Sequence, residues 1–259
     1  MNKFSVDVLD LSGQIVDSMN LPKVFETPLR PDIIKRAVLA IQSHRYQAQG
    51  RDPWAGNKTT AESRGVGLGI SRIPRVKGQN RAALAPSTVG GRTTHPPKSE
   101  KKIWKKIPKK EMKFALRTAV AATADRIIVT SRGHVVNGVK EFPLVVTDEI
   151  QKLKKTRKAL DAFSQLGLSS DIYRVKKSRG VRAGKGKRRG RKMKQAVGPL
   201  LVITKNEGII EAARNLPGVD ATIINNLNVE LLAPGTHPGR FTLWSSSAIG
   251  MIDSLFGEN

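Results

Sequence analysis

The side chains in this sequence that are best suited to chemistry are cations separated by small residues. Residues 179–192 read RGVRAGKGKRRGRK, so Lys and Arg are interspersed with Gly, Ala and Val. Small residues let a backbone lie close to a crowded surface while each cationic side chain contacts one phosphate. The pattern predicts electrostatic binding of a polyanion; a solvated tail or a localisation signal is the alternative.

Two glycine-rich stretches resemble nucleotide-binding loops only in part. Gly65, Gly67 and Gly69 alternate with apolar residues, but a dinucleotide fingerprint must follow a strand and open a helix, and here a proline and another glycine follow. The stretch 180–187 lacks the Ser or Thr that holds magnesium in a P-loop, because Arg188 stands there. We expect bends at the three glycines that let the backbone pass close to another surface.

Residue types that commonly catalyse reactions are not arranged to do so. The chain has no cysteine, which removes disulfides, thiol catalysis and cysteine-ligated zinc. Its histidines, at 44, 95, 134 and 237, show no metal-ligand spacing and no neighbouring acids placed for acid–base work. We therefore predict no catalytic residue, no metal site and no cofactor.

Aromatic residues interrupt the basic sequence at three positions. Tyr46, Trp54 and Trp104 lie among cations in a segment otherwise without aromatics. Such a ring can stack on an unpaired base. Equally, it can pack where the segment leaves a folded domain. Trp244 lies in the apolar segment 241–244 and is expected in the core.

Charge is unevenly distributed along the 259 residues, which carry 46 Lys and Arg, 21 Asp and Glu and a net charge of +25. Residues 45–110 hold 16 basic and 3 acidic side chains, residues 174–194 hold 12 basic and none acidic, and the remainder holds 18 of each sign. A field of this size repels itself unless an anionic partner neutralises it. We predict a polyanionic partner bound by these two stretches.

The first basic stretch, 45–110, does not read as a packed domain. It contains eight Gly and six Pro, without a sustained period of 3.6 or 2. A loop of this length is uncommon inside a compact domain unless it is a functional arm or disordered. We expect it to be extended.

The neutral remainder predicts an α/β domain, because 39% hydrophobic residues suffice for a core and apolar runs alternate with helical patterns. Expected strands are 4–8, 15–16, 127–130, 144–147, 172–175, 200–204 and 221–224. Two helices are expected to begin at Pro31 and Pro108. A third is expected over 153–166, closed by Gly167, and a fourth is expected to be capped by Asn206. Nearly continuous apolar strands favour a sheet covered on both faces.

The predicted fold class is α/β: a single Rossmann-like domain, with a mostly parallel sheet flanked by helices. It comprises residues 1–44 and 111–259, with the extended basic loop 45–110 inserted between them. A second, shorter basic loop, 174–194, projects from it between two strands.

No apolar run approaches the about 18 residues that a membrane span needs, and residues 1–11 lack the features of a signal peptide. We expect a soluble, cytosolic protein.

Five stretches together resemble the family of the universal large-subunit ribosomal protein four, in its archaeal and eukaryotic branch. They are 61–78 (AESRGVGLGISRIPRVKG), 90–97 (GGRTTHPP), 182–187 (RAGKGK), 214–218 (RNLPG) and 232–241 (LAPGTHPGRF). They span almost the whole chain. The sequence lacks the long basic C-terminal extension of the eukaryotic branch, which favours the archaeal type.

The resemblance implies a structural constituent of the large ribosomal subunit, in the cytoplasm, that binds and organises 23S-type ribosomal RNA and has a role in subunit assembly. Its loop would reach the nascent-peptide exit tunnel and help to form the narrow part. The implied partners are large-subunit ribosomal RNA, neighbouring ribosomal proteins and the nascent peptide, with no membrane and no cofactor. The implied tunnel tip consists of Gly65, Gly67, Gly69, Arg72, Pro74 and Arg75.

The residues expected to bind ribosomal RNA are the cations of the two stretches together with one histidine. They are Arg45, Arg51, Lys58, Arg64, Arg72, Arg75, Lys77, Arg81, Arg92, His95, Lys98, Lys101, Lys102, Lys105, Lys106, Arg179, Arg182, Lys185, Lys187, Arg188, Arg189, Arg191 and Lys192.

Two other functions compete with this interpretation. An RNA-modifying enzyme with an α/β cofactor domain needs a glycine-rich turn directly after a strand and an acid near the next strand end, and the sequence offers neither. A DNA-packaging or transcription-associated protein would show a groove-reading element such as a helix-turn-helix, and none stands out.

Overall fold

The structure is a computed structural model that describes residues 5–256. The chain forms two compact units. One, the sheet unit, comprises the chain up to Ile41 and from Lys106 onward; the other, the arm, runs from Gln42 to Lys105. Phe4, expected at the start of the first strand, lies outside the described residues.

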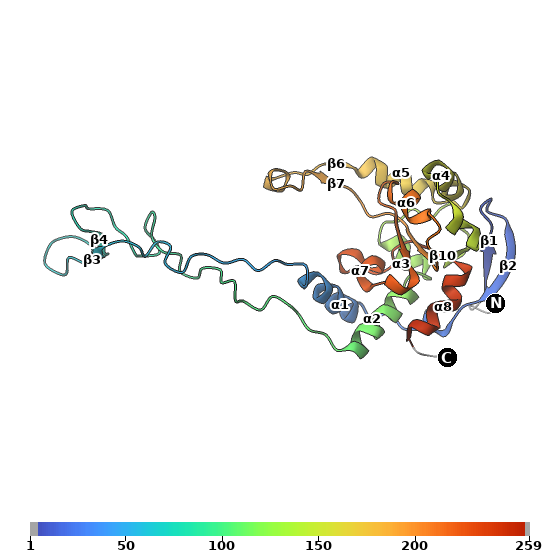
Figure 1. Cartoon of the computed structure of the whole chain (residues 1–259), viewed down its shortest axis with the longest axis horizontal. Coiled ribbons are helices and arrows are strands. Elements are labelled where there is room, and N and C mark those ends of the chain that lie inside the picture. The colour runs from blue at the N-terminus through green and yellow to red at the C-terminus, as the bar shows by residue number, and fades with distance from the viewer. Residues whose placement is uncertain (1–4, 257–259) are drawn as a thin grey trace. The chain divides into compact units, whose positions relative to one another are not determined.

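The sheet unit is built on a six-stranded sheet with the order β2-β1-β5-β10-β8-β9. Figure 1 labels β1, β2 and β10 of this sheet. Its strands are β1 (Ser5–Leu9), β2 (Ile15–Asn20), β5 (Leu144–Val146), β8 (Leu200–Ile203), β9 (Asp220–Ile223) and β10 (Thr242–Ser245). β1 and β2 form an antiparallel hairpin, whereas every other neighbouring pair is parallel. The prediction of a mostly parallel sheet is therefore confirmed.

Helices flank this sheet. They are α1 (Pro31–Ser43), α2 (Lys109–Ala121), α3 (Arg126–Ser131), α4 (Thr156–Gln165), α5 (Ser169–Ser178), α6 (Ile209–Arg214), α7 (Val229–Leu232) and α8 (Ser246–Phe256). Single 3-10 turns are η1 (Lys23–Glu26), η2 (Asp148–Lys152), η3 (Lys185–Arg188), η4 (Ile224–Asn226) and η5 (Pro234–Thr236). The helix starts expected near Pro31 and Pro108 are confirmed. The predicted cap Asn206 lies two residues before the N-cap position of α6, which is Gly208, and its Oδ1 accepts the N–H groups of Gly208 and Ile210.

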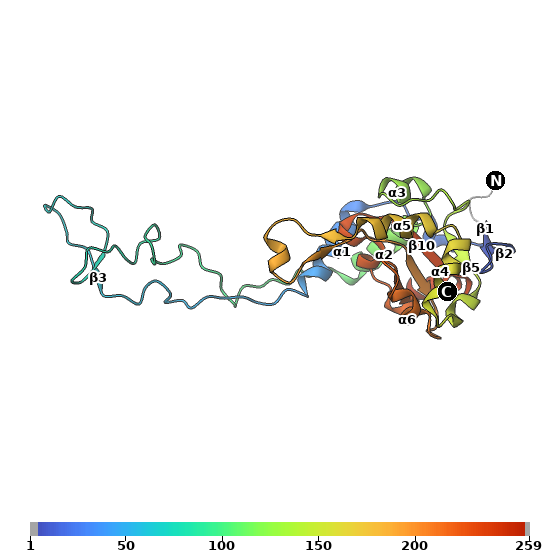
Figure 2. The same cartoon turned by 90° about the horizontal axis from the view of Figure 1, so that it is seen from above.

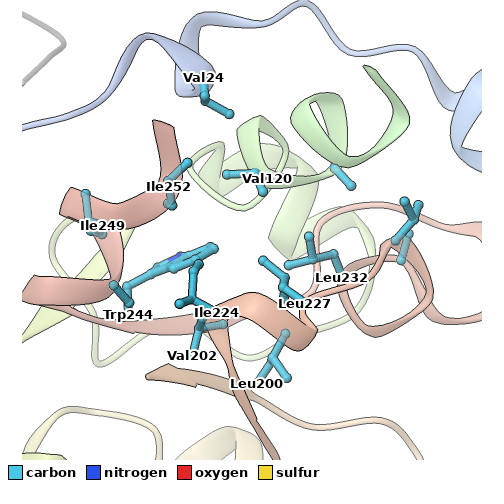
Figure 3. Close-up of a cluster of buried hydrophobic side chains, with 14 of the residues drawn as sticks. Val24, Val120, Leu200, Val202, Ile224, Leu227, Leu232, Trp244, Ile249 and Ile252 are labelled. Carbon is cyan, nitrogen blue, oxygen red and sulfur yellow. The ribbon is translucent and has the colours of Figure 1, made fainter. Parts of the chain in front are cut away.

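The core lies on both faces of the sheet. Strands β5, β8 and β10 are buried along their whole length, and successive residues join two different hydrophobic clusters because side chains alternate along a strand. Val202 and Trp244 belong to the first cluster, together with residues of α1, α2, α7 and α8 (Figure 3). Ile203 and Leu243 belong to the second, with residues of α3, α4, α5 and α6. Phe25 meets Trp244 edge to face, with ring centroids 6.1 Å apart.

Two predicted strands were wrong. Residues 127–130 lie in α3, where the Asp125 carboxylate caps the helix by accepting the N–H of Ile127 at 2.8 Å. Residues 172–175 lie in α5, in which Ile172 and Val175 are buried and Tyr173 is exposed, a helical spacing. Short apolar runs do not separate a strand from a buried helix turn. The second basic stretch therefore begins inside a helix. Its first five residues form the end of α5, and the rest of the stretch follows that helix.

Within the arm, most of the chain has no regular secondary structure, and two limbs run side by side (Figure 2). The backbone N–H of Arg51 donates to Pro97 O at 3.1 Å and that of Lys77 donates to Thr60 O at 3.3 Å. The one strand pair described in the arm consists of β3 (Ala61–Glu62) and β4 (Arg75–Val76).

Candidate nucleic-acid interface

The arm tip, residues 63–74, is closed by short-range contacts at its neck. β3 pairs with β4 in antiparallel register, so Glu62 lies opposite Arg75. The Ser63 hydroxyl donates to Arg72 O at 2.8 Å, and Lys77 Nζ lies 3.1 Å from a carboxylate oxygen of Glu62. Local hydrogen bonds rather than a hydrophobic core therefore define the tip.

Glycines give the tip its curvature. Gly65, Gly67 and Gly69 have φ angles of 80°, 87° and 65°, in the left-handed region that L-residues with side chains avoid. A Cβ at any of the three would meet no atom within 4 Å. The bends predicted there are confirmed. Because these turns expose Val66 and Leu68, the tip presents apolar side chains as well as cations.

The predicted RNA-binding residues of the first basic stretch are exposed, with one exception. Arg75 is half-buried, and its Nη1 donates to Asn80 O at 2.5 Å. Lys58 and Lys77 form ion pairs with acids of the arm, but pairs this exposed contribute little stability. The structure brings Arg64, Arg72 and Arg75 to the same end of the arm and spreads most of the other cations along both limbs.

The second basic stretch contains a β-hairpin, here called the basic hairpin, residues 179–194. β6 (Gly180–Val181) pairs with β7 (Met193–Lys194), and η3 forms the turn region. The Arg182 N–H donates to Lys192 O at 2.8 Å, and Arg182 Nε donates to Arg191 O at 3.1 Å. All its predicted RNA-binding side chains are exposed, and within the described chain none of them forms an ion pair with an acid.

The aromatic residues of the arm differ in their surroundings. The Trp104 ring stacks on the His44 ring, with centroids 6.2 Å apart and an interplanar angle of 9°, and the Lys105 N–H donates to Ser43 Oγ nearby. Trp104 thus packs at the base of the arm, although 69% of it is exposed. Trp54 is 66% exposed and remains a candidate for base stacking.

The carboxyl ends of the parallel strands, where α/β folds bind nucleotides, are filled by the protein's own side chains. Asp148 accepts hydrogen bonds from the hydroxyl of Ser247, at 2.6 Å, and from its N–H, at the start of α8. Burial would raise the pKa of Asp148, but these hydrogen bonds outweigh it and lower the pKa. Gln151 donates to Asp148 and Thr204. A carboxylate therefore occupies the helix terminus that a phosphate would need.

One buried polar group was missed in the sequence. His134 Nδ1 lies 3.0 Å from Asp171 Oδ2, and Arg174 Nε donates to the other oxygen of Asp171 at 2.8 Å. The sequence spacing gives no indication of this buried pair, in which the acid is also held by Arg174. The partners are 37 positions apart, and Asp171 and Arg174 meet as neighbours one helical turn apart only because this segment is helical.

Metal-ligating side chains do not gather anywhere in residues 5–256 in groups of three or more. The same residues contain no helix that is both long and apolar enough to cross a membrane.

Comparison with known proteins gives one consistent result. Residues 19–255 match the profile of the family described as "Ribosomal protein L4/L1 family". The protein named large ribosomal subunit protein uL4 of Methanosphaera stadtmanae is 47% identical, over 98% of both chains. Proteins of that name from Archaeoglobus fulgidus, 48% identical over 93% of this chain and 95% of the relative, and from Saccharolobus islandicus, 45% identical over 97% and 94%, are also similar.

Proposed function

This chain belongs to the ribosomal protein L4/L1 family, and from that premise we propose how its parts serve the large ribosomal subunit. Membership makes it a structural constituent of the subunit that binds ribosomal RNA, not an enzyme. The filled carboxyl edge of the sheet agrees, since the site where an α/β cofactor domain would bind a nucleotide is occupied by Asp148.

This proposal rests on where the charge lies relative to the folded core. All the excess charge lies in two exposed stretches, whereas the rest of the chain, with its two-sided hydrophobic core, is formally neutral. Cations that replace condensed counterions on RNA phosphates gain affinity from the release of those ions, largely without reading sequence. We assign RNA binding to the arm and the basic hairpin, through the cations and His95 identified above.

The boundaries of the parts follow from this assignment. Residues 45–110 act as one basic loop inserted into a globular domain made of residues 1–44 and 111–259; the loop is extended as far as Pro108, and its last two residues begin α2. Its extended backbone and its lack of a hydrophobic core suit a segment that threads between RNA helices, because both limbs can be covered with phosphates at once.

The arm tip reaches the nascent-peptide exit tunnel and narrows it. Gly65, Gly67 and Gly69 set the curve, while Arg72 contacts RNA at the tunnel wall. Arg75 and Pro74 hold the neck of the tip, because Arg75 bonds to Asn80 O and Pro74 O accepts the N–H of Ala83 at 2.9 Å. The apolar side chains between the glycines face the nascent peptide.

Sedimentation of a cell lysate, in low and in raised salt, tests the assignment. The protein is expected to travel with the large subunit in equal amount and to resist a moderate salt wash. Crosslinking from position 72 would then recover large-subunit RNA bordering the tunnel. A protein that stayed at the top of the gradient in both salts would overturn the ribosomal assignment, whereas crosslinks confined to RNA away from the tunnel would overturn only the placement of the tip.

A further inference from the structure

The sheet unit contains a cavity of about 600 Å³ lined on one side by cations. Leu29 and Ile128 form part of its apolar wall, and Arg132, His134, Arg174 and His237 supply its nitrogen atoms. It lies away from the carboxyl ends of the strands, and neither the arm nor the basic hairpin lines it.

Arg132 is the least compensated charge in this cavity. Its guanidinium donates to two backbone carbonyls, Pro234 O at 2.7 Å and His237 O. Within the described chain no carboxylate lies within ion-pair distance of it. Burial, together with the nearby charges of Arg240 and Arg174, lowers the pKa of Arg132 to about 10. A half-buried cation with only neutral partners has a desolvation cost that no opposite charge offsets, and a bound anion would offset it.

Asp171, the acid that bonds to the cavity residues His134 and Arg174, has its hydrogen-bonding capacity already used. Asp171 is fully buried and accepts from Arg174 Nε, His134 Nδ1 and the N–H of Val135, at 2.8, 3.0 and 2.9 Å. These contacts neutralise Arg174 in part and leave nothing for Arg132. The cavity therefore holds more positive than negative charge, even with both histidines neutral.

The cavity is also continuous in the chain with the basic hairpin. Arg174 lies on α5, five residues before the hairpin begins, and Ala196 and Val197 on the cavity wall follow directly after it. Arg174 Nη2 donates to Val197 O at 2.9 Å, so the two sides of the hairpin's base are tied together at the cavity. An RNA strand following the hairpin cations would reach this point.

We infer that the cavity is a built site for a single RNA backbone phosphate, held by Arg132 and Arg174, at the base of the basic hairpin. The inference rests on the proposed function. A guanidinium already fixed by two carbonyls is preorganised, because little side-chain entropy remains to be lost when its free N–H groups meet phosphate oxygens. RNA is favoured over an acidic protein segment because the flanking hairpin offers a series of exposed cations, separated mainly by small residues and with no acid among them.

The first test compares salt dependence of binding. The full chain, its Arg132→Gln variant and an Arg157→Gln control, at an exposed position of α4 outside the cavity, are titrated with 23S-type ribosomal RNA over a range of salt concentrations. Loss of one phosphate contact is expected to reduce the slope of log K against log salt by about 0.7 to 0.9 in Arg132→Gln. An unchanged slope, or an equal change in Arg157→Gln, would overturn the proposal. Failure of the unmodified chain to bind would instead remove the proposed function.

A second pair of variants guards against simple misfolding of Arg132→Gln. Val197 lines the cavity and is 38% exposed, so Val197→Glu places a carboxylate where the phosphate would sit and Val197→Gln is its neutral match. We expect Val197→Glu to melt higher than Val197→Gln in low salt, because it compensates Arg132, yet to bind RNA more weakly. Equal melting and equal RNA affinity in the two variants would contradict the inference.

Free phosphate distinguishes the two sources of the ligand. At constant ionic strength, inorganic phosphate in place of chloride is expected to raise the melting temperature of the unmodified chain and not that of Arg132→Gln. If phosphate stabilises the chain while the RNA salt slope is insensitive to Arg132→Gln, the cavity is a small-anion site and the assignment to RNA is wrong.

Discussion

The Arg240 guanidinium lies 2.5 Å from the Asp220 carboxylate, and the same side chain joins two further segments of the sheet unit. Its Nε donates to Gly198 O at 2.9 Å and its Nη1 donates to Leu231 O at 3.0 Å. Arg240 is 1% exposed, and burial lowers its pKa in spite of the opposing effect of Asp220. This arginine stabilises the fold by joining segments of the sheet unit and does not contact nucleic acid, although the protein is strongly basic.

Replacing Arg240 tests that distinction. Arg240→Met should lower the free energy of unfolding by about 2 to 5 kcal/mol, because buried carbonyls lose their donor. Asp220→Asn should cost about 1 kcal/mol or less, since half of the carboxylate is exposed. Urea unfolding of both variants measures the difference. A near-neutral Arg240→Met would show that water replaces the guanidinium.

The His134–Asp171 pair predicts a dependence of stability on pH. Burial lowers the pKa of His134 below its ordinary value of 6.5, although Asp171 opposes the shift, so the folded protein keeps the ring neutral and its Nδ1–H donates to Asp171. A histidine whose pKa is lower in the folded state contributes stability above about pH 6.5, which is lost as pH falls below that value. Burial would raise the pKa of Asp171, but hydrogen bonds from His134 and Arg174 hold it low, so its own contribution is lost only at more acidic pH, below the ordinary value of 3.8.

Melting temperatures between pH 8 and pH 5 measure this effect. His134→Gln keeps a donor for Asp171 but does not titrate, so the decline below about pH 6.5 should become shallower than in the unmodified chain. The other three histidines are present in both proteins and cancel in the comparison. Parallel curves would show that His134 does not carry the pH dependence.

Gly167 predicts a steric limit at the end of α4. It has a φ of 82°, and a Cβ there would lie 2.4 Å from Gly138 O. Gly167→Ala should destabilise the sheet unit by more than the about 1 to 2 kcal/mol that a left-handed backbone alone costs. Gly133→Ala provides the control, since Gly133 has a φ of 98° and open space around it. Equal losses in chemical unfolding would mean that the contact with Gly138 relaxes freely.

Charge removal at the arm tip should separate folding from assembly. Arg72→Gln combined with Arg75→Gln is expected to change the free energy of unfolding of the sheet unit by no more than about 0.5 kcal/mol, because neither side chain contributes to the core. Incorporation into large subunits, followed on sucrose gradients against Arg157→Gln, should fall. Loss of the sheet unit's thermal transition in the double variant would contradict this separation.

Much of the fold could be predicted because local signals coincide with tertiary ones. Pro31 and Pro108 lie at helix starts, and the strands at 144, 200 and 220 are apolar runs bounded by turn residues. Segment 241–244 was predicted as core, but its role as strand β10, between β5 and β8, depends on pairing that composition does not encode.

The errors have one physical cause. The runs at 127–130 and 172–175 are too short for periodicity to separate strand from helix, and the decisive features were the Asp125 cap and contacts across the fold. The pair of His134 with Asp171 and the filling of the sheet edge by Asp148 and Ser247 join residues 37 and 99 positions apart. No local pattern indicates either.

Because most of the excess charge lies in the arm and the basic hairpin, outside the two hydrophobic clusters, folding and charge neutralisation can occur at different times during biogenesis. Charge repulsion is therefore weakest among the segments that form the two hydrophobic clusters, and packing of these clusters does not require RNA to neutralise the arm. The cations of the arm and the basic hairpin, in contrast, are neutralised only when the RNA binds them. A newly made chain therefore has a packed core and two cationic segments that lack their RNA partner. Those segments need protection from other anions from synthesis until the chain is incorporated into the subunit.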